Sequence, residues 1–360
     1  MSFTPYNAPL LSGLLGHMEI AAQFSVKADI EAMLKVETML AKSQAEAGLI
    51  RQEHYEEIER ACSEFEPDMV KLQNGVLRDG MAVPEFIRQL RETCKSEAGD
   101  ALHFGSTSQD VIDTSLIVRL VRVNSILERS LIETLDELSS LESKFGSRTL
   151  MARTRMQAAL SVSVADRLRL WSEPLANLKS KFVDICEQLH VIQLGGPVGD
   201  LNKMGEKGAH VRSLLAKNLD LFDPGSAWHT DRTRLYNYCN WLSDVCGATG
   251  KIGQDILLMA QNEVNEIHLK DPGGSSAMAH KKNPVKAEVL ITNARFVASL
   301  NSGLQHNKVH EQERSGSAWT FEWLMLPQLC VATGASLRNT IAVLKSVIEI
   351  AQSETRKPTI

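Results

Sequence analysis

The chain has 360 residues, of which 43% are hydrophobic and 23% charged, and its formal net charge is −5 at pH 7. The composition is that of a soluble globular protein, and the acidic balance argues against nucleic-acid binding through a broadly basic face. No apolar run reaches the ~20 residues that cross a membrane, and the N-terminus lacks a signal-peptide pattern, so we expect a cytoplasmic protein. The six cysteines are scattered, which predicts free thiols in a reducing compartment.

Residues 1–105 are predicted to form a small N-terminal helical domain, because glycine and proline break their short helical patterns repeatedly. The breaks fall at Gly48, Pro67, Gly75, Gly80, Pro84 and Gly99. Residues 106–360 carry much longer helical patterns, which predict a central domain built as a bundle of long helices.

The first long pattern ends near residue 145, and its apolar residues are spaced three or four apart, as on one face of a helix. They are Leu116, Leu120, Val123, Leu127, Leu131, Leu135, Leu138 and Leu141. Further long helices are predicted at residues 161–190, 233–269, 285–306 and 326–353. Alternating strand patterns are nearly absent, so we expect an all-α fold. Helices this long also predict a bundle made from several chains.

Two features interrupt these helical patterns. Pro174 should kink or break the second helix. Gly247, Gly250 and Gly253 share one helix, where each glycine costs about 1 kcal/mol relative to alanine. They indicate either a close approach of a neighbouring helix or a bend.

Polar residues gather just before the first long helix, in the segment "HFGSTSQDVIDTS". Ser106, Thr107, Ser108 and Gln109 precede the apolar run, so one of them should cap the helix. Four such groups exceed what a cap needs, and exposed N–H groups at a helix start bind anions. The sequence alone leaves a plain cap and an anion site equally open.

Two further polar segments lie between long helices. "MARTRMQAALS" holds Arg153, Thr154, Arg155 and Gln157, and by itself it is interpreted as a solvated basic loop. "HEQERSGSAWTFEW" holds Arg314 and an i, i+4 tryptophan pair, and by itself it is interpreted as an interhelical loop with core aromatics.

The segment "PGGSSAMAHKKNPVKAE" indicates the strongest chemistry. Its two glycines allow the backbone to approach a ligand closely, and Ser275 and Ser276 supply hydroxyls. Lys281 and Asn283 could both reach one carboxylate and stabilise the extra charge it takes when the neighbouring carbon loses a proton. Serine is a usable base only where cations and N–H dipoles stabilise its alkoxide.

Other chemistries lack their motifs. There is no G-x-S-x-G, no Walker loop and no G-x-G-x-x-G after a strand. The ten histidines show no metal-ligand spacing, so we expect neither a metal nor another cofactor. His103, His229 and His280 lie beside the polar segments and are candidate site residues, whereas His268 is interpreted as structural.

Together, the polar segments resemble the fumarase/aspartase superfamily of homotetrameric lyases. "GGSSAMAHKKNP" is similar to its G-S-S-x-M-P-x-K-x-N-P signature, "STSQDVIDTS" to its T-S-x-D…T region, and "ARTRMQAA" in part to its T-H-x-Q region. The resemblance implies a long-helix bundle with a small N-terminal helical domain, with the C-terminal domain largely missing here. It also implies a homotetramer whose active sites are shared by three subunits.

Within that superfamily the chain resembles the 3-carboxy-cis,cis-muconate cycloisomerases of protocatechuate breakdown, through the segments already quoted and "AWHTDRTR". The resemblance implies that Ser275 is the general acid/base next to a carboxylate, which Lys281 and Asn283 hold. Thr107 and Ser108 then correspond to a second anion-binding segment, and Thr154 and Gln157 to a third.

Two residues depart from the superfamily pattern. Ala279 replaces the signature proline, and Arg155 replaces the histidine of T-H-x-Q. Arginine does not donate a proton at neutral pH, whereas a cycloisomerase uses the substrate's own carboxylate as nucleophile and needs no such acid. Arg155 and Arg314 are therefore expected to bind spectator carboxylates of a tricarboxylate substrate. The alternatives are a lyase that eliminates fumarate from an adenylosuccinate-type substrate, and a non-catalytic helical scaffold.

Overall fold

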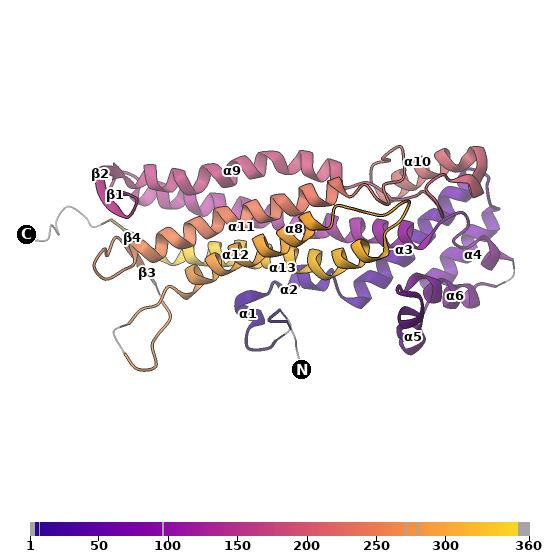
Figure 1. Cartoon of the computed structure of the whole chain (residues 1–360), viewed down its shortest axis with the longest axis horizontal. Coiled ribbons are helices and arrows are strands. Elements are labelled where there is room, and N and C mark those ends of the chain that lie inside the picture. The colour runs from indigo at the N-terminus through magenta and orange to yellow at the C-terminus, as the bar shows by residue number, and fades with distance from the viewer. Residues whose placement is uncertain (1–3, 7, 96, 271, 279–280, 352–360) are drawn as a thin grey trace, which may run out of the picture.

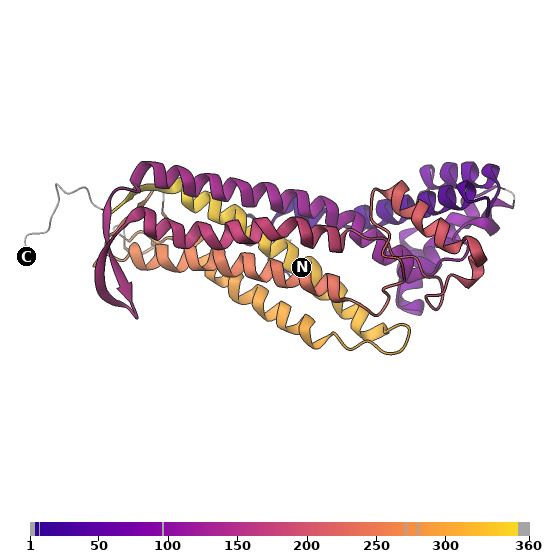
Figure 2. The ribbon, with the colours of Figure 1, turned by 90° about the horizontal axis from the view of Figure 1, so that it is seen from above.

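The computed structural model describes residues 4–6, 8–95, 97–270, 272–278 and 281–351 and shows an elongated helical molecule (Figure 1). Five long helices form a bundle along the long axis, most of the shorter helices gather at one end of it, and α1 and α2 lie beside its middle (Figures 1 and 2). The all-α prediction is confirmed. In the described ranges, no helix is long and apolar enough to span a bilayer.

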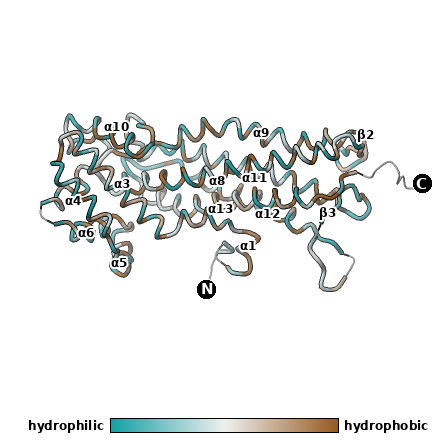
Figure 3. Tube along the Cα trace, turned by 180° about the vertical axis from the view of Figure 1, so that it is seen from behind, coloured by the Kyte–Doolittle hydropathy of each residue, from teal (hydrophilic) through white to brown (hydrophobic). Residues whose placement is uncertain are grey.

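The five bundle helices run side by side along the long axis, and α8, with 38 residues, is the longest of them. Helix α11 packs against α9, α12 and α13, and α8 packs against α9 and α13. Apolar and polar stretches alternate along these helices, as expected when each buries one face (Figure 3). The helices are α8 (Ser108–Phe145), α9 (Val164–Leu189), α11 (Thr233–Met259), α12 (Val285–His306) and α13 (Gly316–Ser346).

The apolar face predicted for α8 is the buried one. Seven of its eight predicted residues are buried, and Leu135 is only partly so. Thr134 takes the buried position beside Leu135, and its hydroxyl donates to the Ser130 carbonyl at 2.8 Å. A threonine fits here because this bond satisfies the one polar group that it buries.

The glycines of α11 explain how closely α12 approaches. A Cβ at Gly250 would lie 2.7 Å from the Ala294 side chain, and one at Gly253 would lie 2.6 Å from the Ala287 carbonyl oxygen. The close-approach interpretation is therefore confirmed at these two positions. Gly247 meets no atom within 4 Å and plays no part in the contact.

A second hydrophobic core lies under the shorter helices at one end of the bundle. It joins the N-terminal helices to α10 and to the first turns of α8, whereas α1 and α2 pack on α13 in the bundle. The domain boundary at residue 105 stays a prediction. The short helices are α1 (Ser12–Leu15), α2 (Met18–Ala22), α3 (Val26–Glu46), α4 (Gln52–Ser63), α5 (Met69–Asp79), α6 (Val83–Thr93), α7 (Ala98–Ala101), the 3₁₀ helix η1 (Asn202–Lys207) and α10 (Gly208–Leu219).

Four short strands stand where the sequence predicted helix or loop. Strand β1 (Thr149–Thr154) pairs antiparallel with β2 (Gln157–Ser163), and β3 (Ile267–Leu269) pairs antiparallel with β4 (Val347–Ile350). Helix α9 therefore starts at Val164, not at residue 161, because Ser163 caps it. The third predicted helix likewise ends ten residues early, and the fifth both starts and ends early.

Pro174 lies inside α9, which continues through it to Leu189, so the interruption predicted there is absent. Pro327 lies in the same way inside α13. Neighbouring long helices pack on both α9 and α13, and this packing offsets the backbone hydrogen bond that each proline removes.

Candidate active site

The predicted site residues lie at the two opposite ends of the bundle. Thr107 and Arg314 lie where α8 and α13 begin, whereas the β1–β2 hairpin and the loop after β3 lie at the other end (Figures 1 and 2). With 1.5 Å per residue, the 38 residues of α8 separate these ends by about 57 Å. One chain therefore cannot bring all predicted groups around one small substrate.

At the start of α8, the cap and the anion-binding candidates coincide. Thr107 is the N-cap residue, and its backbone N–H donates to the Asp110 carboxylate at 3.0 Å. Its hydroxyl accepts a hydrogen bond from Arg314 at 3.1 Å, and Arg314 also donates to the Pro197 carbonyl at 2.9 Å. The structure thus brings together two predicted residues that lie 207 positions apart in the chain.

The other residues of this segment differ in their accessibility. Gln109 is 1% exposed, and its side-chain amide donates to Asp113 at 3.2 Å and to the His229 carbonyl at 3.0 Å. Its hydrogen-bonding groups are therefore turned into the protein. Ser106 is buried, while Ser108 is partly exposed in the first turn of α8.

Two candidate histidines each contact a carboxylate at this end. His229 Nε2 lies 2.8 Å from Asp110, whose carboxylate also accepts the backbone N–H groups of Gly195 and Gly196. His103 Nδ1 lies 2.6 Å from the buried Glu37 carboxylate. Burial alone would lower the pKa of His103, but Glu37 outweighs it and raises that pKa above its ordinary value.

A buried ion-pair network beneath this end was missed by the sequence analysis. Arg232 is fully buried between Asp113, at 2.6 Å, and Glu322, also at 2.6 Å. Burial would lower the pKa of Arg232, but the two carboxylates outweigh it, so the guanidinium stays charged. The i, i+3 pair Asp110 and Asp113 on a buried face, together with the arginines of "AWHTDRTR", was the available signal.

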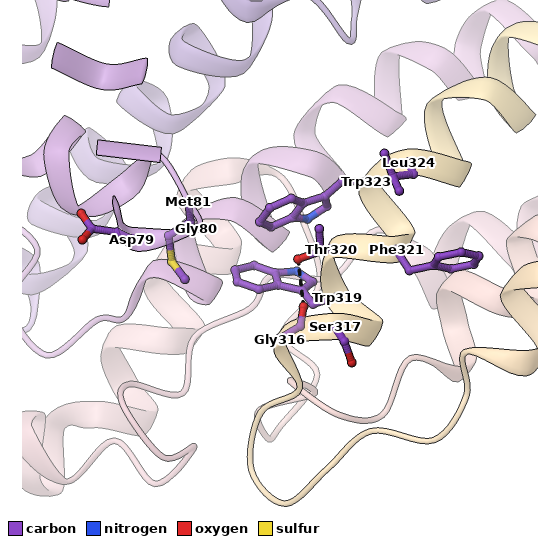
Figure 4. Close-up of a pocket in the computed structure, with 10 residues that line it drawn as sticks. All are labelled: Asp79, Gly80, Met81, Gly316, Ser317, Trp319, Thr320, Phe321, Trp323 and Leu324. Atoms are coloured by element: carbon purple, nitrogen blue, oxygen red, sulfur yellow. Dashed lines mark hydrogen bonds between the residues drawn. The ribbon is translucent and has the colours of Figure 1, made fainter. Parts of the chain in front are cut away.

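The tryptophan pair of α13 packs beside this network, as its spacing predicted. Trp319 donates its indole N–H to Asp113 at 3.1 Å, and its ring lies edge-to-face with that of Trp323 at 4.8 Å. Figure 4 shows both rings facing the α5–α6 turn around Met81 across a cavity of about 490 Å³. The cavity is largely apolar, and the one carboxylate on its lining, Asp79, is paired with Arg78 at 2.6 Å.

The serine loop, residues 272–278 and 281–284, lies at the opposite end of the bundle. Its two arms are joined by backbone hydrogen bonds between Gly273 and Asn283, at 2.8 and 2.7 Å. Ser275 Oγ accepts backbone N–H groups from Ala277 at 3.3 Å and from Met278 at 3.2 Å. Two such donors are what a serine alkoxide needs for its stabilisation.

The second arm of the serine loop carries the predicted carboxylate holders. Lys281 and Asn283 line one cavity of about 440 Å³ with Lys282 and the end of α11. Asn283 also donates to the Gly274 carbonyl at 3.2 Å, and Ser276 is exposed. Ala279 and the candidate His280 lie outside the described residues.

The β1–β2 hairpin carries the third set of candidates. The segment predicted as a basic loop is two strands, with Thr154 paired to Gln157 across the turn. Arg155 and Met156 form the turn with φ of 49° and 67°, a left-handed conformation that two-residue hairpin turns require. Thr154, Arg155 and Gln157 are all exposed, so they are available to a ligand or to another chain.

Comparison with known proteins relates this arrangement to a family. The model of a lyase family matches residues 17–298. The 3-carboxy-cis,cis-muconate cycloisomerase of Acinetobacter baylyi is 32% identical over 94% of this chain and 77% of its own, and that of Pseudomonas aeruginosa is 33% identical over 92% and 73%. The crystal structure of the 3-carboxy-cis,cis-muconate lactonizing enzyme of Pseudomonas putida matches with a TM-score of 0.88 and 31% identity, over 94% and 77%.

The family match covers most of the chain, and the named relatives share both its sequence and its fold. The long-helix bundle and the order of the polar segments agree with this relationship. The chain belongs to this lyase family, as an enzyme of the fumarase superfamily related to the 3-carboxy-cis,cis-muconate cycloisomerases.

Proposed function

We propose that the chain converts 3-carboxy-cis,cis-muconate to 4-carboxymuconolactone in protocatechuate breakdown. The observation that carries this proposal is the likeness, at 32–33% identity over more than nine-tenths of the chain, to relatives named for this reaction. The arginine at position 155 supports it, because a cycloisomerase needs no proton donor where a lyase of this superfamily has histidine. The six free cysteines fit action in the cytoplasm.

The proposed reaction uses only fixed charges and one proton. A carboxylate oxygen of the substrate forms a bond to a diene carbon, and the displaced π electrons move into a second carboxylate, giving an aci-acid. Lys281 and Asn283 hold that dianion. Ser275, or a group acting through it, then delivers a proton to the adjacent carbon, which restores the carboxylate and completes the lactone.

The two backbone N–H groups at Ser275 Oγ support this role, because they lower the free energy of the alkoxide left after proton transfer. Arg155 and Arg314 bind the spectator carboxylates. Arg314 also donates a hydrogen bond to the Thr107 hydroxyl. This contact places the N–H groups at the start of α8 beside the carboxylate that Arg314 binds.

We further propose a homotetramer in which each active site takes groups from three chains. The separation of about 57 Å between Thr107 and the hairpin along α8 supports it, since a tricarboxylate of this size spans far less. The exposed hairpin and serine loop of one chain would then meet the α8 start of another.

The activity is tested by following the loss of diene absorbance when the protein is mixed with 3-carboxymuconate, beside a parallel assay with adenylosuccinate. We expect absorbance loss with the first substrate only. Cleavage of adenylosuccinate by the unmodified protein would contradict the proposal. If Arg155→His gains that cleavage, the assignment to the cycloisomerase branch is also wrong.

The shared site is tested by mixing the variants Ser275→Ala and Arg314→Gln, unfolding them together, refolding, and assaying at a substrate concentration well below the KM of Arg314→Gln, where both variants are weakly active. If a site takes Ser275 from one chain and Arg314 from another, an equal mixture restores about a quarter of the sites. If both residues come from one chain, every site in the mixture carries one defect and no activity returns. Each variant refolded alone is the control.

A further inference from the structure

A cavity of about 460 Å³ lies between the β1–β2 hairpin, the first turns of α9 and the second half of α11. Four cationic side chains line it. The charged residues on its lining are Arg153, Arg155, Arg167, Lys251 and Asp255, and apolar side chains line much of the rest. We refer to it as the hairpin cavity.

Two of the four cations of the hairpin cavity are already neutralised. Arg153 donates to both oxygens of Glu266, at 2.8 and 2.9 Å. Lys251 donates to both oxygens of Asp255, at 2.5 and 2.6 Å. Asp255 is fixed in turn by the indole N–H of Trp171, at 2.7 Å. Each of these two cations therefore already has a carboxylate counterion.

Arg155 and Arg167 remain without a counterion. Within the described ranges, neither guanidinium is within salt-bridge distance of a carboxylate or hydrogen-bonded to another side chain. Arg167 is partly buried and lies in the first turn of α9, where the helix dipole disfavours a cation. A neighbouring arginine, Arg169, instead pairs with Asp166 at 3.4 Å. The fold thus places two uncompensated guanidinium groups on one cavity.

We propose that the hairpin cavity binds a carboxylate arm of an organic polycarboxylate between Arg155 and Arg167. The apolar lining favours a carbon skeleton over an inorganic anion, because a bare phosphate would gain nothing from these side chains. This lining consists of Met156, Leu170, Leu258, Met259 and Val264. The inference deepens the proposed function, on which it rests for the part played by Arg155, and it adds Arg167 as a residue that sets substrate specificity.

The test measures binding alone, so it is independent of the reaction. Tricarballylate, a saturated tricarboxylate that cannot cyclise, is titrated calorimetrically into the full-length protein and into Arg167→Gln and Arg155→Gln. Each charge-assisted contact contributes about 1.5–3 kcal/mol, so each variant should bind about 10–100-fold more weakly. The matched control, Arg169→Gln on the same helix, should bind as tightly as the unmodified protein.

Three results would overturn this assignment. They are equal affinity in Arg167→Gln and the unmodified protein, an equal loss in Arg169→Gln, and inorganic phosphate binding as tightly as tricarballylate. Circular dichroism of each variant confirms that it is folded before titration. If the protein binds tricarballylate through Arg167 but does not turn over 3-carboxymuconate, the proposed reaction fails and this binding site stands.

Discussion

The two ends of the bundle are built on opposite principles. At the α8 start, Asp110, Asp113 and Arg232 are buried, and each has several hydrogen-bond partners. At the hairpin end, Thr154 and Arg155 are exposed, and among the described residues Ser275 bonds only within its own loop. The first end is preorganised by its own chain. The second presents its candidate groups on exposed segments, as the proposed site shared between chains requires.

The largest effect should follow a change at the exposed end. Ser275→Ala removes the proposed proton carrier, so kcat should fall by about 10²–10⁴-fold. Stability should hardly change, because in the part of the chain that the structure describes the Ser275 hydroxyl bonds only to backbone N–H groups of its own loop. Steady-state kinetics and thermal unfolding measure the two quantities.

Ser299→Ala is the matched control for Ser275→Ala, because Ser299 is an exposed helix serine whose hydroxyl bonds only to the Arg295 carbonyl. Its kcat should equal that of the unmodified protein. Near-normal turnover in Ser275→Ala would remove serine from the mechanism. A large loss of stability in that variant would show that the serine loop supports the fold.

At the end where α8 starts, a substitution should instead reduce stability more than activity. Arg232→Met leaves Asp113 and Glu322 buried without their cation, which should lower the free energy of unfolding by about 3–5 kcal/mol. Arg169→Met is the surface comparison, and the loss of its solvent-exposed pair with Asp166 should change the free energy of unfolding far less. Urea denaturation measures both, and equal losses would contradict the contrast between the two ends.

The sequence predicted the bundle well because periodicity reports burial directly. The apolar face of α8 and the close approach at Gly250 and Gly253 both follow from local pattern and from the space a side chain needs. The β1–β2 hairpin escaped prediction because its turn residues, Arg155 and Met156, are not the Asn-Gly type that marks such turns. Strands this short also carry too few residues to show alternation.

For the candidate site, too, the sequence predicted the local motifs but not the contacts between distant segments. Individual motifs pointed to Thr107, Ser275 and Lys281, but no local pattern tells which motifs share an end of the bundle. The contact between Thr107 and Arg314 joins residues 207 positions apart, so only the tertiary fold reveals it. The network around Arg232 was missed for that reason, since its two carboxylates come from different helices, α8 and α13.

A smaller effect is expected at Arg314, which both holds the Thr107 hydroxyl at the start of α8 and is proposed to bind a substrate carboxylate. Arg314→Gln removes the charge proposed to bind a spectator carboxylate, and kcat/KM should fall by about 10–100-fold, mainly through KM. Arg314→Lys keeps the charge but loses the planar fork, so it should recover only part of the loss. Kinetics over a range of substrate concentrations separate kcat from KM. A fall confined to kcat would contradict the role in substrate binding.

The smallest effect concerns His103 and its dependence on pH. Because Glu37 raises the pKa of His103 in the folded state, the pair stabilises the protein fully below the unfolded pKa of about 6.5. That contribution is lost as the pH rises through the folded pKa. His103→Gln should therefore lower Tm by about 2–4 °C at pH 6, and the difference should shrink as the pH rises. His54→Gln, a partly exposed histidine bonded to Arg51, is the control. A Tm difference that stays constant from pH 6 to 9 would show that the charge of His103 does not contribute to the stability of this end.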